Sequence, residues 1–297
     1  MQYWRDGAMA PSPRKLTSMP DDHAPCRRPD TGDAALAVAP AGSRPHHAQP
    51  RLMHLRAVPM PAKASALLAA RSAPLPGIDA RLHLLEYCPS WFDPSLFATV
   101  GMACPASIAR SVPKRQAEFL FGRLAARTAL ASLGCADNIE VGIGSARQPL
   151  WPAGFIGSIT HAGRYAGAVV LPRDTHQGVG IDIEGVVEGD MREALLATAL
   201  DPAEAMLLHE ARCAHWSHDA LITAAFSAKE SLFKAAFGAV GRFFGFEAAR
   251  CIGWDRRTGR LHLMLTETLC PTFPQGRICE IGVWRLDHGT VFTCLRC

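Results

Sequence analysis

The chain has 297 residues, of which 48% are hydrophobic and 20% charged, so it is long and apolar enough to bury a sizeable core in one or two domains. Its formal net charge of +4 is unevenly placed: residues 1–77 hold ten Lys and Arg against five Asp and Glu, whereas residues 78–297 hold 21 against 22. A near-neutral folded part argues against a nucleic-acid substrate.

The first 77 residues have the composition of a tail that lies outside the fold. They contain 12 of the 22 prolines and show no sustained helical or strand period. The apolar run AALAVAPA is too short for a membrane span and lacks the flanks of a signal peptide. We therefore expect a disordered, basic, Pro-rich tail over residues 1–77 that can be removed without loss of activity. We also expect a cytoplasmic protein with no transmembrane segment.

Ten cysteines are scattered along the chain without a regular spacing. Cys294 and Cys297 form a terminal CxxC, but no second CxxC exists to complete a zinc site. The pattern indicates reduced thiols of a cytoplasmic protein.

The first half of the folded part contains one strong helix and several strands. KRQAEFLFGRLAARTALASL predicts a helix over residues 114–133, and Gly134 follows as a natural residue to end it. Strands are expected at residues 80–87, 139–143, 155–160, 165–172 and 178–185. The short turn HAGR between the third and fourth of these predicts a hairpin.

The second half begins with helices and ends with strands. Asp190 and Glu193 form a capping-box pattern, Pro202 suits the first turn of the next helix, and Gly238 closes a long helix over residues 219–238. Antiparallel strands are expected at residues 260–266, 277–286 and 290–295.

Each half thus places a helix before its last strands. The halves also share a short sequence similarity, because EFLF at Glu118 and ESLF at Glu230 both fall in expected helices. We expect an α+β fold of two similar halves, residues 78–176 and 177–297, with helices packed on antiparallel sheets. The halves would be related by a pseudo-two-fold axis, with the active site in the cleft between them.

The stretch GVGIDIEG places two acids, Asp182 and Glu184, on one face of a strand, because strand side chains alternate. Like charges on a half-buried face repel each other and resist desolvation. A hard cation such as Mg²⁺, which prefers oxygen ligands, would remove that repulsion. The alternative is a solvent-facing strand with two harmless acids.

A second motif, FSAKESLFKAAF, places Glu230 and Lys234 one helical turn apart. On a helix that otherwise packs, a carboxylate and an ammonium group are what a metal–phosphate site needs. The alternative is an ordinary exposed ion pair.

Two further groups of residues are candidates for phosphate binding. Thr160 and His161 lie at a strand end before a glycine turn, and Arg115 and Arg123 share a broad helix face. A structural histidine and a solvated helix face are the alternatives.

The order of these motifs is more specific than any one of them. The sequence from about residue 80 to 297 resembles the 4′-phosphopantetheinyl transferase superfamily, in particular its two-domain, single-chain branch of the enterobactin-synthetase component D type. The motifs that carry the resemblance are Arg-x-x-Glu-Phe-x-x-x-Arg, Trp151-Pro152, Thr160-His161, GIDIE and FSAKESLFK.

The resemblance implies transfer of the phosphopantetheine arm of coenzyme A to a serine of an apo carrier protein, with release of 3′,5′-ADP. It implies that Asp182, Glu184 and Glu230 hold Mg²⁺, and that Glu230 also takes the serine proton. Lys234 and His161 match residues that contact the phosphates of coenzyme A.

The nucleotide end of coenzyme A is assigned by the same resemblance. Arg115 and Arg123 match positions that bind it, and Thr160 stands where many relatives carry Ser before the His. The loop against the adenine matches Ala146, Arg147, Gln148 and Pro149. Gln148 departs from the charged residue of many relatives.

The partners implied are apo acyl, peptidyl or aryl carrier domains and coenzyme A, with no nucleic acid. We expect a monomer that associates at most peripherally with a synthetase complex. Two alternatives remain: a Mg²⁺-dependent phosphodiesterase or nuclease that uses the same carboxylates on water, and a non-catalytic protein that only binds carrier domains.

Overall fold

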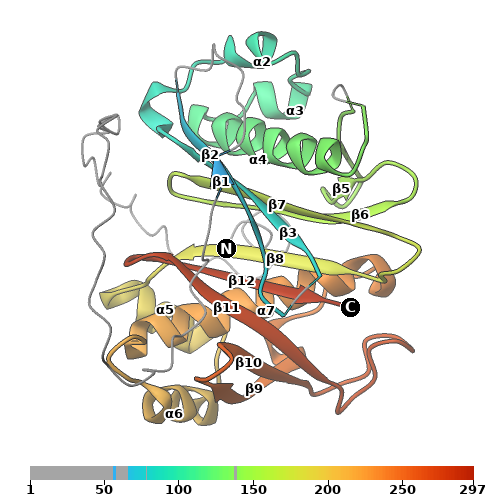
Figure 1. The fold of residues 1–297 in the computed structure, drawn as a ribbon. Helices are drawn as coiled ribbons and strands as arrows, with labels where there is room; N and C mark the ends of the chain where they lie inside the picture. Colours follow the sequence, from blue (N-terminus) through green and yellow to red (C-terminus); the bar gives the residue numbers. More distant parts are fainter. Residues whose placement is uncertain (1–55, 58–65, 78, 137–138) are drawn as a thin grey trace, which may run out of the picture. The chain divides into compact units, whose positions relative to one another are not determined.

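The computed structural model describes residues 56–57, 66–77, 79–136 and 139–297, and all of these belong to one compact unit, Ala39–Cys297 (Figure 1). The first 55 residues of the predicted tail lie outside the described residues.

The first half is an antiparallel sheet with one long helix on it. The sheet has the order β1-β2-β3-β7-β6. Its strands are β1 (Arg56–Ala57), β2 (Leu67–Pro74), β3 (Arg81–Tyr87), β6 (Phe155–Ala162) and β7 (Tyr165–Pro172). Helix α4 (Pro113–Ser132) packs on β7, β3 and β6. The shorter elements are η1 (Pro89–Trp91), α2 (Leu96–Thr99), α3 (Ala106–Ala109), β4 (Gly142–Ile143) and β5 (Pro149–Leu150).

The second half repeats this plan with the order β8-β12-β11-β10-β9. Its strands are β8 (Val179–Gly185), β9 (Ala249–Asp255), β10 (Arg260–Leu265), β11 (Ile278–Asp287) and β12 (Thr290–Arg296). Its helices are α5 (Gly189–Thr198), α6 (Pro202–Ala211), α7 (His218–Val240) and the short η2 (Phe246–Ala248). Helix α7 packs on β8 and β12, and most of its residues are buried.

The two halves share one connectivity. In the first, β3 leads to α4 and then to the hairpin β6–β7, and β3 pairs with β7. In the second, β8 leads to α7 and later to the hairpin β11–β12, and β8 pairs with β12. The expected α+β fold of two similar halves is therefore confirmed.

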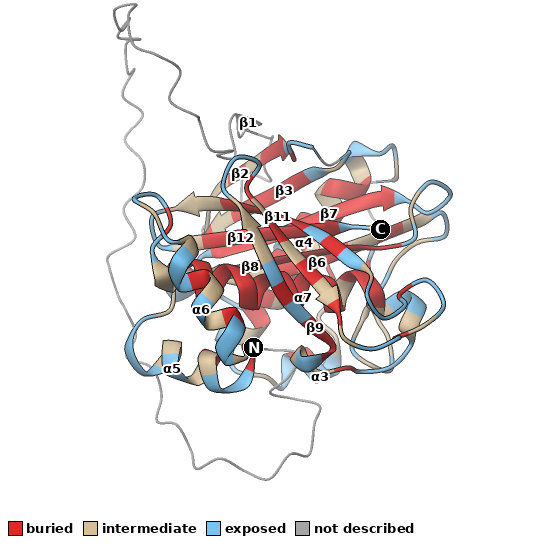
Figure 2. Cartoon of the chain, turned by 90° about the horizontal axis from the view of Figure 1, so that it is seen from below, coloured by how far each residue is buried: buried red, intermediate tan, exposed pale blue. Residues whose placement is uncertain are grey.

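One apolar cluster joins the two sheets. It contains Leu82 and Leu84 of β3 together with Ile181 and Ile183 of β8, all almost fully buried. Most residues of β3 and β8 are buried, as the red stretches of these strands in Figure 2 show. Burial of such side chains is the main favourable term in folding, so the contact between the halves is a second core.

Three local expectations are wrong. The tail ends before residue 77, because β2 pairs with both β1 and β3 and buries Ala70 and Ala73. The strand expected over residues 139–143 is limited to Gly142–Ile143. The long second-half helix ends at Gly241, whose φ of 69° is left-handed, and not at Gly238.

The capping box lies one helix later than predicted. Helix α5 begins at Gly189, so Asp190 falls inside the first turn, where an acid favours the helix dipole without capping it. Asp201 caps α6 instead: its Oδ1 accepts from Glu204 N at 2.9 Å, and Glu204 Oε2 accepts from Asp201 N at 2.8 Å.

We expect removal of β1 and β2 to destabilise the protein. A chain beginning at Gly77 loses both strands and leaves β3 as an unpaired sheet edge, which promotes aggregation. Compared with a chain beginning at Met53, which retains both strands, it should melt at least about 5 °C lower and aggregate sooner. Thermal unfolding and size-exclusion chromatography compare the two. Equal melting temperatures would show that β2 is dispensable.

Candidate active site

Glycines in β8 bring the two acidic motifs together. A Cβ at Gly180 would lie 1.9 Å from Ser231 O of α7, and one at Gly178 would lie 2.2 Å from Ala235 O. No other residue type fits at these two positions without moving backbone. The helix that carries Glu230 and Lys234 therefore lies directly on the strand that carries Asp182.

Asp182 accepts hydrogen bonds from three side chains. It is 4% exposed, and Lys234 Nζ donates to its Oδ1 at 2.6 Å. Thr160 Oγ1 donates to the same oxygen at 3.1 Å, and Ser227 Oγ donates to Oδ2 at 2.9 Å. These bonds come from a helix and a neighbouring strand, so they hold the Asp182 carboxylate in one orientation.

Glu184 lies close enough to Asp182 and Glu230 for their charges to act on it. Glu230 is 2% exposed and Glu184 is half-buried. Burial, then the charge of Asp182 and more weakly that of Glu230, raise the pKa of Glu184 to about 8, whereas Lys234 acts in the opposite direction. The three carboxylates therefore affect one another, as the sequence predicted for two of them.

These acids do not form a closed metal shell. Across the described ranges, no group of three or more His, Cys, Asp or Glu side chains is placed to hold a metal ion. The donor set still fits a divalent cation, because the charge of Asp182 raises the pKa of Glu184 and a positive charge between the two carboxylates would compensate that repulsion.

His161 and Arg115 meet at the end of β6. Arg115 Nη1 lies 3.4 Å from His161 Nε2. Burial, followed by the charges of Arg115 and Lys234, lowers the pKa of His161 to about 3, so the ring is neutral at neutral pH. The influence of Lys234 on His161 links the candidate residues of the two halves.

Arg123, the second arginine expected at the nucleotide end, makes two bonds to backbone carbonyls. Its Nε donates to Val141 O at 2.7 Å and its Nη2 donates to Gly142 O at 3.1 Å. These bonds tie α4 to the strand β4, which leads into the predicted adenine loop.

The loop from Ala146 to Pro149 is a tight turn between β4 and β5. Ala146 N donates to Gln148 Oε1 at 2.9 Å, and Arg147 adopts a left-handed φ of 63°. The side chain of Gln148 also covers Gly144, where a Cβ would meet it at 2.4 Å. The uncharged residue that departs from the family pattern therefore closes the turn.

Thr160 has a role that sequence reasoning missed. It is 3% exposed, and besides donating to Asp182 it accepts from Ile183 N of β8 at 3.0 Å. Ser158 accepts from Ile181 N in the same way, also at 3.0 Å. Two hydroxyls of β6 thus bind the edge of β8 and join the halves beside the acids. The alternation of Ser158 and Thr160 was the available signal.

Comparison with known proteins gives the same division of the chain. A family model for the 4′-phosphopantetheinyl transferase N-terminal domain matches residues 104–171, and one for the 4′-phosphopantetheinyl transferase superfamily matches residues 178–277. The transferase PptT of Mycobacterium tuberculosis is 34% identical over 222 residues, which cover 71% of this chain and 91% of that protein.

The chain belongs to the 4′-phosphopantetheinyl transferase superfamily. Enterobactin synthase component D of Salmonella typhi is also 34% identical, over 64% of this chain and 76% of that protein. The transferase Npt of Nocardia iowensis is 36% identical over 48% of this chain and 61% of its own length. The first family model spans the Arg115–His161 region, and the second spans Asp182 to Lys234.

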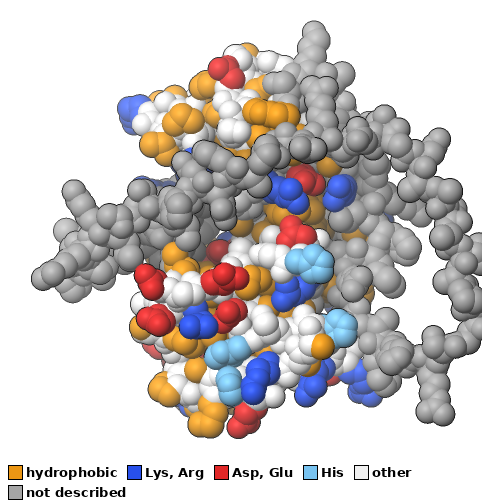
Figure 3. All heavy atoms as spheres, turned by 90° about the vertical axis from the view of Figure 1, so that its left-hand side faces the viewer, with side chains coloured by type: hydrophobic (Ala, Val, Ile, Leu, Met, Phe, Trp, Pro, Cys, Tyr) orange, Lys and Arg blue, Asp and Glu red, His pale blue; other side chains and the backbone are white. Residues whose placement is uncertain are grey.

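Charged side chains of both signs share one face of the described residues. On the face in Figure 3, the described acidic, basic and histidine side chains are interspersed rather than gathered in one basic surface. Among the helices that the structure describes, none is long and apolar enough to cross a bilayer. The nine described cysteines, including Cys294 and Cys297, are all free.

We expect the Thr160 hydroxyl to be needed for the orientation of Asp182. Thr160→Val keeps the shape but removes one donated and one accepted buried hydrogen bond, which should cost about 2 kcal/mol of unfolding free energy. Transfer activity should fall about tenfold, whereas Thr160→Ser should stay close to wild type. Urea unfolding and initial rates test this pair. A Val variant as active as the Ser variant would contradict the assignment.

Proposed function

We propose that this transferase moves the phosphopantetheine arm of coenzyme A to a serine hydroxyl of an apo carrier protein and releases 3′,5′-ADP. One observation carries the proposal: where α7 lies on β8, Lys234 contacts Asp182, and the charges of Asp182, Glu230 and Lys234 all act on Glu184. The charges of Lys234 and Arg115 both act on His161 of the other half. Such a site matches a substrate with one diphosphate and a phosphorylated nucleotide.

Asp182, Glu184 and Glu230 are the residues that would hold Mg²⁺, which when bound would neutralise charge on the diphosphate of coenzyme A. Lys234 Nζ lies 2.6 Å from Asp182 Oδ1, so it is close enough to the three acids to contact a diphosphate placed beside them.

The chemical step needs a proton acceptor and charge stabilisation. The serine oxygen forms a bond to the phosphorus that carries the arm, and the bond from that phosphorus to the 3′,5′-ADP oxygen breaks. Glu230, directly or through water, takes the serine proton. Lys234 stabilises the charge that develops on the leaving 3′,5′-ADP.

The names of the relatives favour secondary metabolism. Enterobactin synthase component D points to siderophore synthesis, and we propose carrier domains of siderophore, nonribosomal peptide or polyketide synthesis as acceptors. We further propose that the enzyme acts as a cytoplasmic monomer, in peripheral contact with the synthetase that it modifies.

The deciding experiment incubates the protein with coenzyme A, Mg²⁺ and a panel of apo carrier proteins, and weighs the products. Transfer adds the mass of one phosphopantetheine arm to the carrier. A phosphodiesterase would release 3′,5′-ADP without modifying any carrier, and a non-catalytic binder would leave every mass unchanged. Either of these results would overturn the proposal.

We expect each of the three acids to be essential. Asp182→Asn, Glu184→Gln and Glu230→Gln should each lower kcat at least about a hundredfold. Each variant removes one of the negative charges that would hold Mg²⁺ at the diphosphate. The control is Glu188→Gln, an exposed acid just beyond β8, which should leave kcat unchanged. A folded variant with near-normal turnover across a Mg²⁺ titration would remove its acid from the site.

We expect Arg115 and Lys234 to differ in kinetics. Arg115→Ala should raise the KM for coenzyme A and spare kcat, since it removes an interaction made equally in ground and transition states. Lys234→Ala should lower kcat, because charge builds on the diphosphate during transfer. Steady-state kinetics of both variants separate the two roles. Equal kcat losses with unchanged KM would refute the division.

A further inference from the structure

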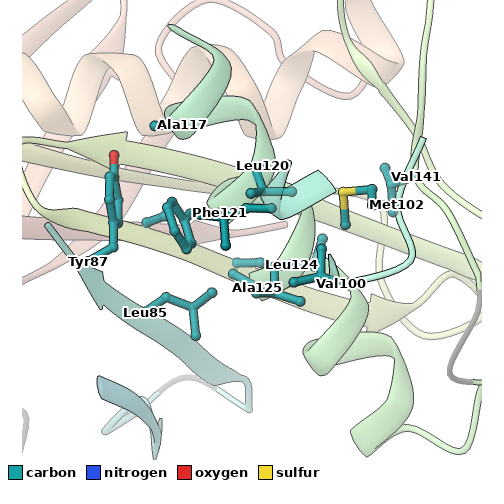
Figure 4. Close-up of a cluster of buried hydrophobic side chains, with 14 of the residues drawn as sticks. Leu85, Tyr87, Val100, Met102, Ala117, Leu120, Phe121, Leu124, Ala125 and Val141 are labelled. Carbon is teal, nitrogen blue, oxygen red and sulfur yellow. The ribbon is translucent and has the colours of Figure 1, made fainter. Parts of the chain in front are cut away.

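Glu118 is a buried carboxylate of the first half to which no role has been assigned above. It lies on α4, is 5% exposed, and follows Ala117 of the apolar cluster drawn in Figure 4. In that cluster the rings of Tyr87 and Phe121 are stacked at 4.2 Å. A carboxylate in such surroundings is costly unless cations or donors compensate it, so its retention needs a reason.

Two candidate coenzyme A residues lie beside this carboxylate. Arg115 Nη1 lies 3.8 Å from Glu118 Oε2, and His161 Nδ1 lies 3.8 Å from Glu118 Oε1. Arg115 Nη1 also lies 3.4 Å from His161 Nε2. The three side chains therefore form a closed triangle between α4 and the end of β6.

The triangle defines the tautomer of His161. A guanidinium can only donate, so His161 Nε2 accepts from Arg115 and the ring proton is on Nδ1. That N–H has no hydrogen-bond partner among the described residues and faces the carboxylate of Glu118. The other charges that act on the ring are Lys114 on α4 and Lys234 on α7, both cationic.

We propose that Glu118 is a positioning residue for coenzyme A: its carboxylate holds Arg115 and His161 in the arrangement that receives a phosphate group of the nucleotide end. The inference rests on the proposed roles of Arg115 and His161. Glu118 would touch neither the substrate nor the reacting phosphorus, so it acts on binding and leaves the chemical step alone.

The direction in which coenzyme A affinity changes distinguishes a positioning role of Glu118 from a purely electrostatic one. A carboxylate near a phosphate site repels the ligand, so its removal should tighten binding if Glu118 only contributed charge. If it orients Arg115 and His161, its removal should weaken binding despite the lost repulsion. The isosteric Glu118→Gln keeps the shape and removes the charge.

The control variant is Glu86→Gln. Glu86 is a half-buried carboxylate of the first half whose ion pairs are with two other arginines, Arg71 at 3.5 Å and Arg164 at 3.4 Å. Both variants are made in the full chain. Coenzyme A binding is measured by calorimetry, transfer by steady-state kinetics, and folding by thermal unfolding.

We expect Glu118→Gln to raise both the Kd and the KM for coenzyme A about tenfold, with kcat within about twofold of wild type. Glu86→Gln should leave all three unchanged. In ¹⁵N spectra, His161 should be the Nδ1–H tautomer in wild type and a mixture in Glu118→Gln. Arg115→Ala should mask the effect, so the double variant should bind no worse than Arg115→Ala alone.

Unchanged or tighter coenzyme A binding by Glu118→Gln would overturn the inference, as would a loss of kcat with an unchanged Kd. If Glu118→Gln fails to fold, Glu118→Asp provides the test, because it keeps the negative charge on a side chain that is one methylene shorter. Coenzyme A binding at the wild-type Kd by that variant would likewise refute positioning. Failure of wild type to modify any carrier would refute the proposed function instead, and the two failures are thus distinguishable.

Discussion

The close contact of α7 with β8 is the constraint on which the rest of the site depends. Gly178 and Gly180 leave no Cβ between strand and helix, so the carbonyls of α7 reach the strand. Only at this distance can Lys234 on the helix bond Asp182 on the strand at 2.6 Å. A side chain at either glycine would separate the acids of β8 from the motif on α7 even if every functional residue were kept.

The site also depends on the first half, although its acids all lie in the second. Thr160 of β6 donates to Asp182 and accepts from the backbone of β8, and Ser158 makes the neighbouring bond. Because these hydroxyls have strand backbone as partners, a relative shift of the sheets would break bonds to the catalytic strand itself. The halves are therefore coupled at the place where coenzyme A is proposed to bind across them.

Sequence reasoning could predict the elements with strong periods and the motifs that lie on them. Helix α4, helix α7 and the hairpin β6–β7 follow from their patterns, and the pairing of GIDIE with FSAKESLFK follows from the family resemblance. The alternation of Ser158 and Thr160 indicated two hydroxyls on one strand face, but their partners were not predictable, because that requires knowledge of which sheet edges meet. The bonds of Arg123 to Val141 and Gly142 were likewise not predictable, because a sequence shows helix faces but not the carbonyls of a distant segment. Strand β2 was missed, because its flanking prolines resembled the composition of the tail.

The repeat of one connectivity shows why only one half holds an acidic site. In β8, Asp182 lies against α7, and Glu184 follows it on the same strand face. In β3, the residues that face α4 are Leu85 and Tyr87, which belong to the apolar cluster of that helix. The first half thus lacks the acids that demand a cation, but it keeps one helical carboxylate, Glu118. With an arginine and a neutral histidine beside it, this carboxylate serves an anion-binding arrangement rather than a cation-binding one. Under the proposed function, the same fold thereby supplies a cation-binding site in one half and an anion-binding site in the other for one substrate.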